Sequence, residues 1–155
     1  MKNKHIAETA IIECEYSDIG DNTKIWNWVH VMKGVKIGKN CMLGNNVFVG
    51  ENVTIGDNCK IQNGVQLFDG VTIGNHVFIG PNVVFTNCRF PNPRMKCETY
   101  SKIMIEDDVM IGANSTIVAP CHVYNNAFIG AGSVVTKDVL GVTVCGNPAK
   151  IIRRY

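Results

Sequence analysis

Apolar side chains recur at every sixth residue along most of the chain. One set begins at Ile19 and stays aliphatic or aromatic through successive steps of six residues to Phe85. A second set lies two residues earlier in each step and holds small or β-branched side chains, from Ser17 to Val83. Glycine often follows the first set, and Asn or Asp fills many of the positions between. A six-residue period matches neither the period of a helix nor the alternation of a simple strand.

The repeat breaks once and then resumes in a new phase. Residues 87–102 fit no six-residue step and contain two prolines, so we expect an inserted loop there. The repeat returns at Ile105 and continues to Val135. The chain is therefore predicted to be one domain with these parts: a lead-in at 1–16, first coils at 17–86, a loop at 87–102, later coils at 103–137 and a tail at 138–155.

A short strand followed by a tight turn, three times per coil, explains the six-residue period. Each coil then uses about 18 residues, with one aliphatic and one small side chain per strand inside, and Gly or Asn tolerates the turn dihedrals. This pattern predicts an all-β fold, a parallel β-helix of hexapeptide repeats with about six coils, roughly 30 Å tall. A β-sandwich is disfavoured because its turns recur every 8 to 12 residues.

Composition narrows the class of protein. Of 155 residues only 18% are charged and 46% are hydrophobic, so disorder is not expected. The net charge of +2 is no electrostatic footprint for nucleic acid or an anionic membrane. No apolar run is long enough to span a membrane. The basic N-terminus is followed by an apolar stretch that Glu8 interrupts, which makes a poor signal peptide and favours a cytoplasmic location.

The seven cysteines are read as structural. Their number is odd and no CxxC pair occurs, so neither disulfides nor a structural zinc site is expected, and no metal is predicted. Cys41, Cys59 and Cys121 fall on the small interior positions, whereas Cys88 and Cys97 are expected to be accessible in the loop. Glycine-rich motifs of Rossmann or P-loop nucleotide sites do not occur.

Several stretches are more selective than the repeat itself. They are Ile25-Trp26 with His30-Val31, GVQLFDG at 64–70, VFIGPNVVFTN at 77–87, RFP at 89–91, IGAGSVV at 129–135 and GNPAK at 146–150. Through them almost the whole chain resembles the left-handed β-helix acyltransferases, and more narrowly the N-acetyltransferases of nucleotide-linked 3-amino sugars. The chain departs from that resemblance at Cys88, where relatives carry Asp, and at the Asn92-Pro93 spacer before Arg94.

The resemblance implies a reaction and an assembly. The reaction is acetyl transfer from acetyl-CoA to the 3-amino group of a nucleotide-linked 3-amino-3,6-dideoxyhexose, by direct attack of the amine on the thioester. dTDP is favoured over UDP as the nucleotide, because the stretches around residues 66–70 and 89–91 look closer to that branch. The assembly is a homotrimer with its sites between subunits.

Residues 18 apart stack in columns, and one outward column holds candidate chemistry. Lys33, Glu51, Asp69 and Asn87 form this column, so a carboxylate lies beside an amide where the repeat breaks. The resemblance implies that Asp69 orients the amine and Asn87 the thioester. It also implies substrate-binding roles for Trp26, His30, Gln66 and Arg94, and coenzyme-binding roles for Ala113, Ala131, Pro148, Lys150 and Arg153.

Three histidines are further candidates, because imidazole is a common general base. His30 is expected to face either the substrate or a neighbouring subunit. His76 continues a column of turn asparagines and is interpreted as structural. His122 lies beyond the loop and, with no acidic neighbour in its own column, ranks lowest.

Other functions remain open from the sequence. A UDP-linked 3-amino uronate could be the acceptor. A γ-type zinc carbonic anhydrase shares the fold, but its HxxxxH spacing does not occur here. A non-catalytic scaffold of stacked repeats is the third alternative, and binding of acetyl-CoA would argue against it.

Overall fold

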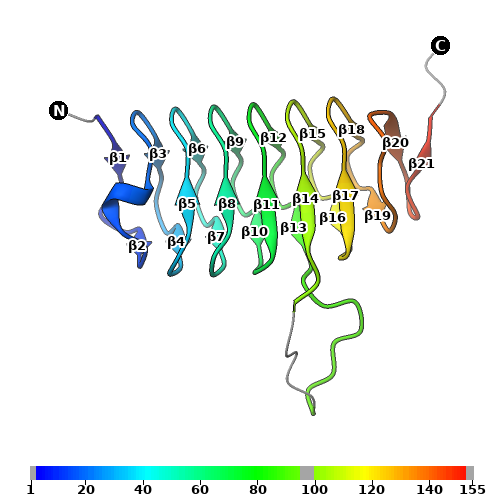
Figure 1. The fold of residues 1–155 in the computed structure, drawn as a ribbon, viewed down its shortest axis with the longest axis horizontal. Coiled ribbons are helices and arrows are strands. Elements are labelled where there is room, and N and C mark those ends of the chain that lie inside the picture. Colours follow the sequence, from blue (N-terminus) through cyan, green and yellow to red (C-terminus); the bar gives the residue numbers. More distant parts are fainter. Residues whose placement is uncertain (1–2, 95–99, 153–155) are drawn as a thin grey trace.

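The computed structural model describes residues 3–94 and 100–152, in which short strands wind into a three-sided parallel prism (Figure 1). Most strands contain two residues because a turn follows each one and redirects the chain onto the next face. Each strand pairs in parallel with its counterpart one coil away, as in the register of Gln66 with Val84. The all-β parallel β-helix predicted from the six-residue period is confirmed.

Three sheets form the three faces. Sheet A runs in the order β1 (His5–Ile6), β3 (Lys24–Ile25), β6 (Met42–Leu43), β9 (Lys60–Ile61), β12 (Phe78–Ile79), β15 (Met110–Ile111), β18 (Phe128–Ile129), β20 (Thr143–Cys145) and β21 (Lys150–Ile151). Sheet B contains β2 (Ile11–Ile12), β4 (His30–Val31), β7 (Phe48–Val49), β10 (Gln66–Leu67), β13 (Val84–Phe85), β16 (Thr116–Ile117) and β19 (Val134–Val135). Sheet C contains β5 (Lys36–Ile37), β8 (Thr54–Ile55), β11 (Val71–Ile73), β14 (Ile103–Ile105) and β17 (Cys121–Val123). We name the turns between them the A–B, B–C and C–A corners.

The two six-residue sets fill the interior of the prism. Every aliphatic position from Ile19 to Phe85 is at most 2% exposed, and so are most of the small positions beside them. Burial of this continuous apolar column, with no polar residue at an aliphatic position, is the main force that holds the coils together. Ser17 departs from the prediction, because it lies exposed on the 3-10 helix η1 (Tyr16–Asp18).

Polar side chains at the small interior positions are all hydrogen-bonded. The Thr23 hydroxyl donates to the carbonyl of Gly38 at 2.8 Å, and the thiols of Cys41 and Cys59 donate to the corresponding glycine carbonyls of the next coil. Ser115 repeats the contact beyond the loop. Each of these groups therefore links one coil to the next, and a buried donor is not left unsatisfied.

The prediction of about six coils is too low. Sheet A contains eight consecutive parallel strands, from β1 to β20, so strands form in both the predicted lead-in and the predicted tail. The sequence period hides these coils because its step changes at the ends. It lengthens to seven residues between Ile12 and Ile19, where η1 intervenes, and shortens to four and five residues from Val135 through Val139 to Val144.

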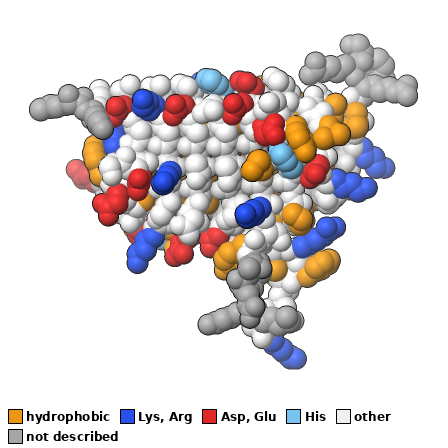
Figure 2. Space-filling model, in the orientation of Figure 1, with side chains coloured by type: hydrophobic (Ala, Val, Ile, Leu, Met, Phe, Trp, Pro, Cys, Tyr) orange, Lys and Arg blue, Asp and Glu red, His pale blue; other side chains and the backbone are white. Residues whose placement is uncertain are grey.

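The inserted segment between β13 and β14 projects away from the prism at the B–C corner (Figure 1). In Figure 2, which views the molecule onto sheet C, hydrophobic side chains gather over the C-terminal half and beside the projection. Within the described ranges, no helix is long and apolar enough to cross a membrane.

Candidate functional site

Asp69 and Asn87 lie on neighbouring coils at the B–C corner. The register pairs Leu67 with Phe85, and each candidate residue follows two positions later. Both side chains are partly buried. The carbonyl of Asn87 accepts a hydrogen bond from the N–H of Ser101 at 2.9 Å, which closes the base of the inserted segment. The structure thus brings the predicted carboxylate and amide together where the repeat is interrupted.

One oxygen of Asp69 has a structural partner. Its Oδ1 accepts a hydrogen bond from the backbone N–H of Glu51, one coil earlier, at 2.7 Å. The same contact recurs at other corners, as from the N–H of Lys39 to Asp57 Oδ1 and from the N–H of Asn45 to Asn63 Oδ1. This contact fixes the direction of the Asp69 carboxylate. The second oxygen is the group that can accept a hydrogen bond from a ligand.

An aromatic row crosses the outer side of sheet B toward this corner. His30 Nε2 lies 2.6 Å from Glu13 Oε1, and the imidazole contacts Phe48 edge-on with the ring centroids 5.7 Å apart. Phe48 in turn lies 5.6 Å from Phe68, the residue before Asp69. Gln66 is on the same strand, and its amide donates to the carbonyl of Gly64. His30 and Gln66 therefore share a face with Asp69.

Trp26, Ala113 and Ala131 are at the A–B corner, on the opposite edge of sheet B. Trp26 packs on His5 with the ring centroids 5.1 Å apart. The coils approach closely at Ala131, since a Cβ added to Gly112 would lie 2.4 Å from the Ala131 backbone nitrogen. Within one chain, the structure does not bring these predicted ligand-binding residues onto the corner that carries Asp69.

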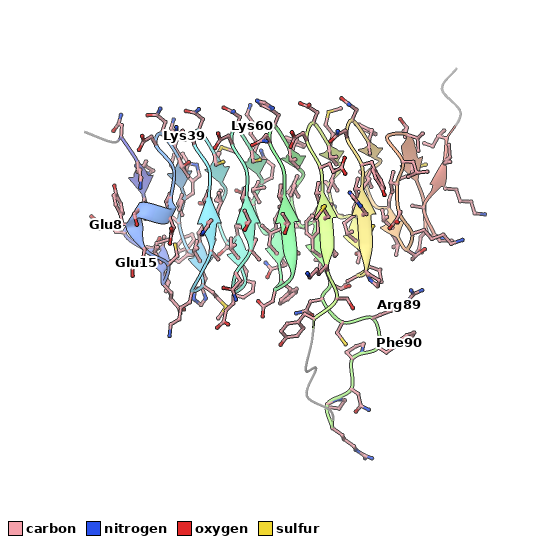
Figure 3. All side chains as sticks on the ribbon, in the orientation of Figure 1. Glu8, Glu15, Lys39, Lys60, Arg89 and Phe90 are labelled. Atoms are coloured by element: carbon pink, nitrogen blue, oxygen red, sulfur yellow. The ribbon has the colours of Figure 1, made fainter. Side chains whose placement is uncertain are left out.

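The remaining predicted contacts are on the insertion and the tail. Arg94 is exposed, and its backbone N–H donates to Asn92 Oδ1 at 3.0 Å. Figure 3 shows Arg89 and Phe90 extending from the projecting segment, where Phe90 is 83% exposed. Pro148 and Lys150 are exposed near the C-terminal end of the prism. Arg153 and Cys97 lie outside the described residues.

His122 has an acidic partner, so the reasoning that ranked it lowest is wrong. Its Nε2 lies 2.6 Å from Glu106 Oε1, and its backbone N–H donates to Asp138. The ring also stacks on Tyr124 with the centroids 3.8 Å apart. The column neighbour of His122 is Met104, and the glutamate lies two residues further along that strand. A search one strand spacing away and two residues along would have found it.

The surroundings of His122 are hollowed on the sheet C face. The hollow has a volume of about 380 Å³ and is lined by Lys102, Met104, Pro120, Cys121, His122 and Asp138. Burial raises the pKa of the Cys121 thiol to about 12, which leaves it protonated and unreactive near neutral pH. His76 has a different environment, at an exposed turn where its ring contacts Asn58.

Metal ligands do not gather in the described part of the chain. Within residues 3–94 and 100–152, no three side chains of His, Cys, Asp or Glu lie together in a way that could hold an ion. The absence of a metal stays a prediction.

Comparison with known proteins gives consistent matches. The bacterial transferase hexapeptide family (six repeats) matches residues 16–51, 40–69, 52–87 and 102–137, which is more than half of the chain. A 2,3,4,5-tetrahydropyridine-2,6-dicarboxylate N-acetyltransferase of Staphylococcus aureus is 47% identical over 55 residues, covering 35% of this chain. The chain spans 23% of the length of that relative.

Two solved structures extend the match. A hexapeptide-repeat-containing acetyltransferase from Vibrio cholerae, complexed with acetyl coenzyme A, is 32% identical and superimposes with a TM-score of 0.60 over 77% of this chain and 70% of its own. An asparagine-for-histidine variant of perosamine N-acetyltransferase from Caulobacter crescentus, in complex with CoA and GDP-perosamine, gives 16% identity and a TM-score of 0.54 over 97% of this chain and 57% of its own. The second likeness shows the fold alone.

Proposed function

The chain belongs to the bacterial transferase hexapeptide family, whose repeats indicate a left-handed β-helix, and on that basis we propose that it is an acetyl-CoA-dependent N-acetyltransferase. Its acceptor is the 3-amino group of a nucleotide-linked 3-amino-3,6-dideoxyhexose, with dTDP favoured over UDP. The observation that carries this proposal is the Asp69–Asn87 pair at the B–C corner, where the insertion interrupts the repeat. A perosamine N-acetyltransferase of the same fold, solved with CoA and a nucleotide amino sugar, supports the class of acceptor.

The reaction needs little from the protein beyond orientation and charge. The nitrogen of the neutral amine forms a bond to the thioester carbonyl carbon, and the carbon–sulfur bond then breaks. The nitrogen loses one proton, and CoA leaves as its thiol with that proton. Because positive charge develops on nitrogen before the proton is lost, a fixed carboxylate beside the amine stabilises the transition state. Holding both reactants in place supplies much of the remaining acceleration.

Asp69 suits the first of these roles. Its Oδ1 is tied to the N–H of Glu51, so the carboxylate does not need to be ordered when the substrate arrives. Asn87, one coil further, offers an amide that can donate to the thioester oxygen or position its chain. His30 and Gln66 lie on the adjoining face, where they would contact the sugar or the nucleotide.

Acetyl-CoA would contact the other edge of sheet B. Ala113 and Ala131 present small side chains at the A–B corner, where a pantetheine chain can approach the backbone. Pro148, Lys150 and Arg153 in the tail are proposed to meet its phosphates. Since the two corners lie on opposite edges of a sheet, a site that uses both must combine two copies of the chain. This requirement favours a homotrimer with its sites between subunits.

An acetyl-transfer assay tests the proposal. Purified protein is mixed with acetyl-CoA and a panel of dTDP-, UDP- and GDP-linked amino sugars, and release of the CoA thiol is followed. We expect turnover with a dTDP-linked 3-amino sugar, and an N-acetylated product by mass spectrometry. A protein that binds acetyl-CoA but acetylates no amino sugar would overturn the proposed acceptor. Light scattering that gives a mass of one or two chains would overturn the trimer.

A further inference from the structure

Trp28 has a backbone conformation that large side chains rarely adopt. Its φ is +57°, in the left-handed region. Among the described non-glycine residues with positive φ, Asn occupies all positions except Trp28, His76 and Asp108. Asn, Asp and His visit this region readily, whereas a bulky residue there is an outlier. Trp28 is therefore the strained member of the set.

The equivalent turns of the other coils show what this position ordinarily holds. At the A–B corner the matching residues with positive φ are Asn46, Gly64, Asn82, Asn114 and Gly132. The turn at Trp28 is also firmly held. Its backbone N–H donates to the Thr9 hydroxyl at 3.1 Å, and that hydroxyl donates to Asn27 Oδ1 at 3.0 Å. The conformation is set by this network, not by the tryptophan.

Burial of the indole does not offset the strain. Trp28 is 63% exposed, so most of its surface gains nothing from the apolar interior. Strained residues that stabilise nothing in their own fold are concentrated at ligand sites. A large, rigid, exposed aromatic ring is suited to stacking on another planar ring.

The position of Trp28 favours one planar ring over another. Trp28 immediately precedes β4 and Asp69 follows β10, two coils away across sheet B. The separation is about 15–20 Å, from two strand spacings and the width of the face, and an extended nucleoside diphosphate hexose can bridge it. His30 and Phe48 line the path between them. The alanines proposed for acetyl-CoA lie toward the C-terminal end of the prism, away from Trp28.

We propose that Trp28 is the platform on which the nucleobase of the nucleotide-linked sugar stacks. This inference rests on the proposed function, because it takes the acceptor to be a nucleotide sugar. The base lies over the indole at the A–B corner, and the sugar extends across sheet B toward Asp69. The adenine of acetyl-CoA is the competing planar ring and is separated from it by the test.

Two variants of one residue make the test sharp. Trp28→Asn places the residue of the sister turns at this position, so relief of backbone strain should raise the midpoint of thermal unfolding, by about 2–4 °C. The same change should weaken binding of dTDP and UDP by about 10-fold or more, as expected for loss of one stacked base. Trp28→Phe keeps a ring in the strained position and should preserve most of the binding without the gain in stability.

Calorimetric titration with dTDP, UDP and CoA alone measures binding without requiring catalysis. CoA affinity should stay within about twofold in both variants. The inference is overturned if Trp28→Asn binds dTDP and UDP as tightly as the wild type, if CoA binding is lost instead, or if the wild type binds neither nucleotide. Failure of acetyl transfer with every amino sugar, despite intact nucleotide binding, would overturn the proposed reaction and leave the stacking site standing.

Discussion

Replacing Asp69 by Asn separates the charge of this carboxylate from its structural contact. The Oδ1 of Asp69 accepts the Glu51 N–H at 2.7 Å, and an amide oxygen can accept the same bond. Elsewhere in the prism Asn does so, since Asn63 Oδ1 accepts the N–H of Asn45 at 2.8 Å. We therefore expect the free energy of unfolding of Asp69→Asn to change by less than about 1 kcal/mol.

The effect on turnover should be much larger. A carboxylate beside the attacking amine stabilises the positive charge that nitrogen acquires in the transition state. Removing one preorganised electrostatic contact of this kind costs about 2–4 kcal/mol. At 1.36 kcal/mol for each factor of ten, kcat should fall by about 30-fold to 1,000-fold. The KM for acetyl-CoA should change little, because Asp69 is proposed to act on the amine.

A matched control is available at another corner. Asp57 Oδ1 accepts the N–H of Lys39 at 2.7 Å, which is the local contact made by Asp69, but it lies at the C–A corner. Asp57→Asn should leave both stability and kcat near wild-type values. Steady-state kinetics with acetyl-CoA and the best amino sugar, with thermal unfolding of both variants, checks the prediction. Equal activities of Asp69→Asn and Asp57→Asn would refute an amine-centred role for Asp69.

Three further predictions follow from other parts of the structure. Gly112→Ala should destabilise the fold by about 1–3 kcal/mol in urea unfolding, because its Cβ would lie 2.4 Å from the backbone nitrogen of Ala131. Iodoacetamide near neutral pH should label Cys88 before Cys121, whose burial raises its pKa to about 12; mass spectrometry showing the reverse order would contradict it. His122→Gln should keep kcat within about threefold of wild type, whereas a 100-fold loss would move proton transfer to the pair that His122 forms with Glu106.

The interior of the prism was predictable because its chemistry is strictly periodic. A side chain at every sixth residue must fit one apolar column, so Ile19 through Phe85 were placed inside by counting alone. The ends were not predictable in this way. There η1 inserts a residue and the tail shortens its turns, so the same parallel pairing continues while the sequence step does not.

The outer surface was only partly predictable. Counting by 18 residues placed Asp69 beside Asn87, which the strand register bears out. It missed contacts that run diagonally between columns, as His122 to Glu106, 16 residues apart, and His30 to Glu13, 17 residues apart. Long side chains reach across a column, so the periodicity of the backbone does not fix their partners.

Local chemistry alone does not distinguish the candidate site from the rest of the prism. Asp69 and Asp57 accept the same backbone hydrogen bond, at the same distance, from residues 18 positions earlier. What differs is the corner. Beside Asp69 the next coil does not close with a tight turn but opens into the projecting segment, whose base is held by the hydrogen bond from Ser101 to Asn87 (Figure 1). An interruption leaves polar groups and backbone beside a rigid carboxylate without disturbing the core, because every residue involved points outward. The place where the repeat breaks is thus a better guide to the site than any single residue type.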